Sequence, residues 1–132
     1  MKTTMTLLVS MIALMTLPMF GATAQAGGTQ KAEVEGDLAK DKIRDVVRAH
    51  LGEVRDCYDD VLAVDPMARA KLVIDFTIGG DGVVTKSAVG AGSDGPAQLG
   101  ECVSKAVRTW KFPAPSGGGD VKVTYPFLFE PG

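Results

Sequence analysis

The stretch KLVIDFTI, residues 71–78, decides the fold because its apolar residues alternate with a period of two. One face of the extended chain carries Leu72, Ile74, Phe76 and Ile78, and the other carries Val73, Asp75 and Thr77. Strict alternation of this kind predicts a half-buried strand. Residues 79–82 (GGDG) tolerate positive φ, and an extended pattern resumes over residues 83–89, so the two runs predict a β-hairpin.

Two amphipathic helices and a third strand flank this hairpin. Residues 43–62 place apolar side chains every three or four positions, which predicts a helix that Asp65-Pro66 ends. A second helix is expected to begin at Pro96, which suits a first helical turn, and its apolar stripe runs from Leu99 to Trp110. Residues 121–129 alternate again and predict the last strand.

The element order is helix, strand, strand, helix, strand, which predicts an α+β domain. One crossing helix returns the chain so that a three-stranded antiparallel sheet needs the spatial order 2-1-3, with residues 71–78 in the centre. Both helices are expected to bury their stripes on one face of this sheet, because three strands offer no second core. Pro126 cannot donate a ladder hydrogen bond, so the last strand is expected to be an open edge.

The N-terminus has the pattern of an export signal. Lys2 precedes an apolar run from residue 5 to residue 20, and Ala24-x-Ala26 follows. This predicts a signal peptide over residues 1–26 that is cleaved between Ala26 and Gly27, and hence a periplasmic protein. The alternative is an uncleaved inner-membrane anchor with the domain facing the periplasm. Residues 27–42 are polar and glycine-containing and are expected to be a flexible linker into a domain at residues 43–132.

Export changes the interpretation of the two cysteines, Cys57 and Cys102. Paired thiols persist as disulfides in an oxidising compartment. Each cysteine lies within the apolar arc of one predicted helix, so a helix-to-helix disulfide is expected. Two buried free thiols are the alternative.

Composition and motifs argue against enzymatic chemistry. The chain has 132 residues and a formal net charge of -2, so it has no cationic field to attract nucleic acid. His50 is the single histidine and is expected to be structural; with Cys57 and Cys102 it makes no metal-ligand or C-x-x-C spacing. We therefore expect no catalytic residues, no metal, no cofactor and no small-molecule substrate.

An open edge strand suggests a binding mode instead. An extended peptide of a cell-envelope partner could add to the strand at residues 121–129, with main-chain hydrogen bonds supplying affinity. The contacts expected for such a partner are Lys122, Thr124, Tyr125, Pro126 and Phe127. In the alternative, Lys122, Pro126 and Glu130 only blunt the edge against aggregation, and pairing of two copies through the edge also stays open.

The chain from about Ile43 to Pro131 resembles a TonB C-terminal domain, and more closely its relative, the C-terminal domain of the gliding-motility proteins AgmX/PglI. The resemblance is carried by residues 71–78, by Gly80-Asp81-Gly82-Val83-Val84, by Cys57-Tyr58 and Cys102, by Trp110-x-Phe112-Pro113, and by Tyr125-Pro126-Phe127-Leu128-Phe129.

The resemblance implies a helix-strand-strand-helix-strand fold in the envelope, with receptor peptides adding at the last strand. It also implies that Tyr58, Trp110, Phe112 and Pro113 form a packing motif of the family. The function expected from residues and resemblance together is an exported protein-binding module. The alternative is a short, membrane-anchored TonB-like energy transducer in a motor, gliding or transport complex.

Overall fold

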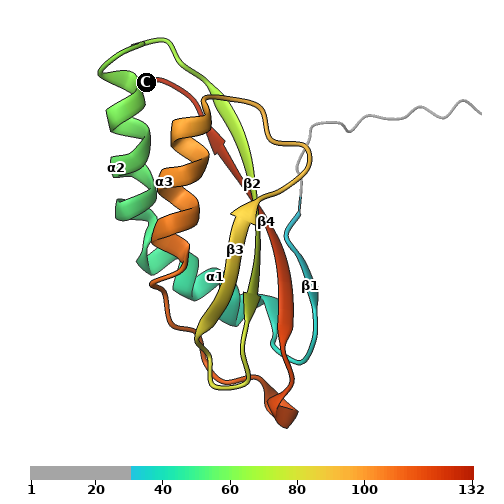
Figure 1. Ribbon diagram of the computed structural model, residues 1–132. Helices are drawn as coiled ribbons and strands as arrows, with labels where there is room; N and C mark the ends of the chain where they lie inside the picture. The colour runs from blue at the N-terminus through green and yellow to red at the C-terminus, as the bar shows by residue number, and fades with distance from the viewer. Residues whose placement is uncertain (1–30) are drawn as a thin grey trace, which may run out of the picture.

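The computed structural model describes residues 31–132, and the predicted signal peptide and its cleavage position lie outside these residues. Its elements are β1 (Glu33–Glu35), α1 (Lys40–Ala49), α2 (Leu51–Leu62), β2 (Ala70–Ile78), β3 (Val84–Val89), α3 (Ala97–Val107), a 3₁₀ turn over Ser116–Gly118, and β4 (Val121–Phe129). Figure 1 shows α2 and α3 side by side across one face of a twisted sheet.

The strands form one antiparallel sheet with the order β1-β4-β2-β3. The predicted α+β class is confirmed, and β2 lies between the two strands predicted to flank it. The predicted three-stranded sheet is wrong, because β1 adds a fourth strand beside β4. Consequently only the part of β4 that β1 does not cover can be an edge of the sheet.

β1 comes from the segment that we predicted to be a flexible linker, residues 27–42. Glu33, Val34 and Glu35 pair with Thr124, Val123 and Lys122. Val34 packs against the core, and Gly36, with φ of 133°, turns the chain beside Val121, where a side chain would not fit. Three residues with one apolar side chain are too few to show a period in the sequence.

The predicted helix over residues 43–62 is two helices that break at His50. The backbone there has φ of -110° and ψ of 10°, and the His50 N–H bonds the Val47 carbonyl at 3.0 Å, which ends α1 with a tight turn. The apolar stripe runs on across the break, because α1 buries Ile43 and Val47 in the same core that α2 covers. Periodicity therefore does not reveal the break.

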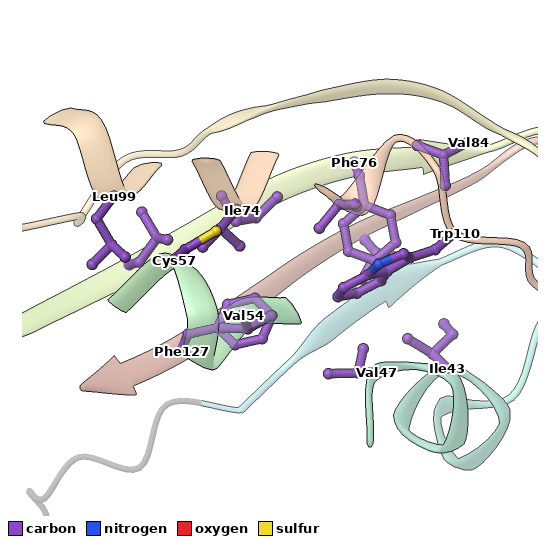
Figure 2. Close-up of a cluster of buried hydrophobic side chains, with 14 of the residues drawn as sticks. Ile43, Val47, Val54, Cys57, Ile74, Phe76, Val84, Leu99, Trp110 and Phe127 are labelled. Atoms are coloured by element: carbon purple, nitrogen blue, oxygen red, sulfur yellow. The ribbon is translucent and has the colours of Figure 1, made fainter. Parts of the chain in front are cut away.

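The core lies between the helices and one face of the sheet. Ile74 and Ile78 of β2 and Val121 of β4 are fully buried. In Figure 2, Trp110 lies between Phe76 of the sheet and Ile43 and Val47 of α1. Among residues 31–132, no helix lies on the other face of the sheet (Figure 1), and the residues of that face are largely polar.

A disulfide joins α2 to α3 through Cys57 and Cys102, as predicted. The two Cα atoms are 5.7 Å apart and the cysteines are 45 positions apart in the chain. Cys57 is buried and Figure 2 shows its sulfur beneath α3. In the chain-entropy description, closing a loop of this length stabilises the folded state by about 4 kcal/mol.

Cys57→Ser should lower the free energy of unfolding by up to about 4 kcal/mol under oxidising conditions, because the unfolded chain regains the freedom of the open loop. Chemical denaturation of the variant and the wild type, each with and without a thiol reductant, measures this. Cys102→Ser should give the same loss, and the reductant should bring the wild type close to both variants. An equal loss with and without reductant would show that packing, not the disulfide, is what Cys57 provides.

Candidate functional site

The sheet offers two edges to a binding partner, and the β3 edge is closed at its centre. The Val73 carbonyl accepts the Gly90 N–H at 2.7 Å, so alternate residues of β2 starting from Val73 bond toward β3. Ser87 lies opposite Phe76, whose backbone N–H and carbonyl point toward β4 and not toward β3. The backbone N–H and carbonyl of Ser87 therefore face outward from the sheet. Its carbonyl accepts hydrogen bonds from Arg108 at 2.8 Å and from Ser104 at 3.2 Å, so an added strand would lose this acceptor.

The first half of the opposite edge is also occupied. β1 covers β4 from Lys122 to Thr124, and these two residues pair with Glu35 and Glu33. Our prediction of an open edge at Lys122 and Thr124 is therefore wrong. The Thr124 hydroxyl is engaged as well, because it donates to the Asp75 carboxylate at 2.9 Å.

Pro126 ends the pairing with β1. It lies opposite Val73, whose backbone groups bond toward Gly90 and Ser93, so the Pro126 nitrogen faces away from β2. In the same register, the residue of the β1 chain opposite Pro126 is Lys31, and proline has no N–H for the Lys31 carbonyl. The ladder between β1 and β4 stops at Thr124 for this reason.

Beyond Pro126 the edge of β4 is open among residues 31–132. The alternation of β4 turns the N–H and carbonyl of Leu128 outward, because Leu128 lies two residues beyond Pro126. The Leu128 side chain is 69% exposed, whereas the other apolar side chains of β4 are buried or half-buried. Pro126 adds an outward carbonyl to this open segment.

An apolar groove of about 340 Å³ lies beside this open segment, between α2 and the end of β4. Its lining comprises Leu51, Val54, Arg55, Tyr58, Asp59 and Leu62 of α2 together with Phe127, Leu128, Phe129, Glu130 and Gly132. Figure 2 shows Val54 of α2 beside Phe127 of β4. A groove of this size is large enough for a bulky apolar side chain.

Tyr58 fixes the two walls of the groove relative to each other. Its ring packs against Phe129 with centroids 5.0 Å apart, and its hydroxyl donates to the Ala68 carbonyl at 2.6 Å. The side chain is 6% exposed, and burial raises the pKa of its hydroxyl. Tyr58 thus stays neutral and keeps donating across the physiological range.

The structure brings only part of the predicted contact set to the open edge. Phe127 lines the groove, Tyr125 packs against Phe127 with centroids 5.2 Å apart, and Pro126 lies on the helix-free face. Lys122 and Thr124 lie under β1. The sequence analysis did not identify Leu51 and Leu128 as residues of the site. A signal for Leu128 was present, because this leucine stands at a position of the β4 alternation that is otherwise occupied by polar residues or proline.

Trp110, Phe112 and Pro113 lie toward the far end of the sheet, near the turn between β2 and β3. The Phe112 N–H donates to the Gly82 carbonyl at 2.9 Å, and the Phe112 ring stacks on Phe76 at 5.5 Å. Gly82 has φ of 88°, and a Cβ there would stand 2.0 Å from the Phe112 carbonyl oxygen. The GGDG turn therefore needs glycine at position 82, because the backbone of Phe112 passes directly against it.

His50 and Glu53 form a structural cluster with Trp110. His50 stacks on Trp110 with centroids 4.8 Å apart and donates from Nδ1 to Glu53 at 2.6 Å, while the Trp110 indole donates to the other Glu53 oxygen at 3.2 Å. The hydrogen bond from His50 holds the pKa of Glu53 below its ordinary value, against the opposing effect of partial burial. This cluster secures the break between α1 and α2.

A group whose pKa is lowered by folding stabilises the fold above its unfolded pKa, and that contribution is lost as the pH falls through the folded pKa. The free energy of unfolding should therefore fall below about pH 4.5 more steeply in the wild type than in Glu53→Gln. Denaturation curves across acidic pH measure this. His50→Phe keeps an aromatic ring stacked on Trp110 but removes the hydrogen-bond donor to Glu53. The free energy of unfolding of this variant should therefore depend less on acidic pH, as in Glu53→Gln. Parallel pH profiles of wild type and Glu53→Gln would contradict this account.

Within residues 31–132, no group of three or more His, Cys, Asp and Glu side chains is arranged to hold a metal ion. In the same part of the chain, no helix has the length and apolar character needed to cross a membrane.

Comparison with known proteins identifies a related family. Residues 67–131 match the family model described as the Gram-negative bacterial TonB protein C-terminal. The match begins just before β2 and ends just after β4, so it includes the open edge and one wall of the groove. No curated protein and no solved structure matches the chain.

Proposed function

Since residues 67–131 form a TonB C-terminal-like domain, we propose that the protein is an exported binding module of the cell envelope. Its partner is an extended segment of an envelope protein that adds as a strand to β4 beyond Pro126. The matched family consists of protein-interaction domains, which supports binding in place of catalysis.

The observation that carries this proposal is the open edge at Leu128. Elsewhere on the two edges, Arg108 and Ser104 occupy the Ser87 carbonyl of β3, and Lys122 and Thr124 of β4 pair with β1. A free main-chain donor and acceptor beside an apolar groove are the two elements of strand addition, since the backbone supplies affinity and the groove supplies selectivity. Edges that are protected against aggregation usually carry charged side chains, whereas the side chain at the open position here is the exposed Leu128.

The proposed binding site lies at Leu128, and not at Lys122 and Thr124 as the sequence suggested. A proline at Thr124 would disturb the pairing with Glu33, and so would not test partner binding. Leu128 is the better position, because its N–H faces away from β2 and a proline there removes no bond of the ladder between β2 and β4.

Leu128→Pro should weaken binding of a strand-adding peptide roughly fivefold, the equivalent of one backbone hydrogen bond of about 1 kcal/mol. The measurement selects peptides from a random display library on the wild-type protein and compares their dissociation constants for wild type and variant. Val89→Pro is the matched control, because Val89 is an outward position of the opposite edge. Its affinity for the peptides should equal that of the wild type.

Amide exchange decides whether the peptide adds as a strand. The Leu128 amide should exchange quickly in the free protein and slowly in the complex, since it gains an acceptor only when a strand is present. Selected peptides that bind Leu128→Pro as tightly as wild type, with no protection at Leu128, would overturn the proposal. Concentration-dependent self-association that protects the same amide would identify a second copy as the strand.

We further propose that residues 1–26 are a signal peptide cleaved before Gly27, which would deliver the module to the periplasm. The intact mass of the protein purified from the envelope fraction of its own host should correspond to a chain that begins at Gly27. A chain that keeps its leader and fractionates with the inner membrane would instead support the membrane-anchored transducer. We also propose that, among TonB-like domains, this one is most similar to the C-terminal domain of AgmX/PglI proteins.

A further inference from the structure

We propose that the groove beside β4 selects a partner segment with two large apolar side chains at positions i and i+2, flanked by neutral or basic residues. This inference rests on the proposed strand addition and specifies which segments it accepts. It follows from three properties of the described residues: the direction of the side chains in an added strand, the position of the groove, and its charge.

Side chains in an added strand alternate between the two faces of the sheet. Directly opposed residues share a face, so partner residues opposite Phe127 and Phe129 point to the helix side, as those two residues do. The partner residue opposite Leu128 points to the helix-free side. The two positions that meet the groove are therefore separated by one residue.

The groove lies on the side of α2 where an added strand would run. Cys57 turns one side of α2 toward α3. The lining residues Leu51, Arg55, Tyr58 and Leu62 recur at intervals of three or four, which places them on a different stripe of the helix. A strand beside β4 would continue the sheet along the line of β1, beneath this stripe.

Two exposed apolar side chains border the groove and lack cover in the described part of the chain. Leu51 is 38% exposed and Leu128 is 69% exposed. Leu51 comes from α2 and Leu128 from β4, so the two side chains lie on opposite walls of the groove. A strand with apolar side chains at i and i+2 would cover Leu51 and bring its backbone over Leu128.

The charges at the groove restrict the residues that flank the anchors. One basic residue, Arg55, stands against two acidic ones, Asp59 and Glu130, among its lining. The groove therefore carries a small excess of negative charge, and the whole chain has a net charge of -2. Acidic flanks on a partner segment would be repelled.

The test compares two synthetic peptides of identical composition, Lys-Ser-Phe-Thr-Leu-Ser-Lys and Lys-Ser-Thr-Phe-Leu-Ser-Lys. The first spaces its apolar residues two apart, so both enter the groove. The second makes them neighbours, so they point to opposite faces. With the full mature chain, the first peptide should bind roughly tenfold more tightly by calorimetry or fluorescence anisotropy.

Leu51→Lys should reduce the affinity for the first peptide roughly tenfold, and that for the second by less, because only one apolar side chain of the second peptide faces the groove. Val64→Lys is the matched control, because Val64 is 84% exposed, follows the end of α2 and does not line the groove. It should bind both peptides as the wild type does. Circular dichroism of both variants verifies their fold, and neither residue is buried.

Equal affinity for the two peptides would overturn the selectivity of the groove. Strand addition itself would still stand if the Leu128 amide became protected in both complexes. Binding of neither peptide, while library-selected peptides protect Leu128, would also overturn the inference and leave the proposed function intact. Loss of affinity in Val64→Lys equal to that in Leu51→Lys would show that added charge, not the groove, is responsible.

Discussion

Burial of one face of β2 is the constraint on which the rest of this structure depends. Ile74 and Ile78 are fully buried and Phe76 nearly so, and this burial requires cover from the helices on one side of the sheet. The same strand pairs with β3 on one side and with β4 along nine residues on the other. The directions of its backbone groups then fix which residues of the neighbouring strands face outward. The open position at Leu128 is a distant result of that alternation.

The two sheet edges are closed by different means, and this difference creates the site. At β3, Arg108 and Ser104 reach from the α3 side to occupy the Ser87 carbonyl. At β4, the chain folds back on itself as β1, but only until Pro126 withholds a donor. Within residues 31–132, this one proline both limits the pairing with β1 and leaves the end of β4 without a neighbouring strand. Natural sheets usually protect their edges, so an uncovered segment beside an apolar groove favours a binding role.

The sequence predicted the elements that have long, regular patterns and missed those that depend on tertiary contacts. β2 and β4 were predicted from alternation, and α3 from the spacing of apolar residues such as Leu99, Val103 and Val107. β1 was missed because Val34 alone gives no pattern, and the break at His50 was missed because the stripe continues through it. The open edge was predicted on the right strand but at the wrong end, since Lys122 and Thr124 are covered by a strand the sequence did not indicate. The groove joins Leu51 to Leu128 across most of the chain, and no local pattern connects them.

The disulfide and Tyr58 together have a consequence for how fast a partner would leave. Cys57 ties α2 to α3, and Tyr58 ties α2 to the chain before β2 and to β4, so both walls of the groove exist before anything binds. A preorganised site loses little conformational entropy on association, and the cost of ordering falls on the incoming segment. Differences among partners of one such site appear mainly in their dissociation rates. The module is therefore suited to hold segments for times set by their two anchor side chains, while capturing all extended segments at similar rates.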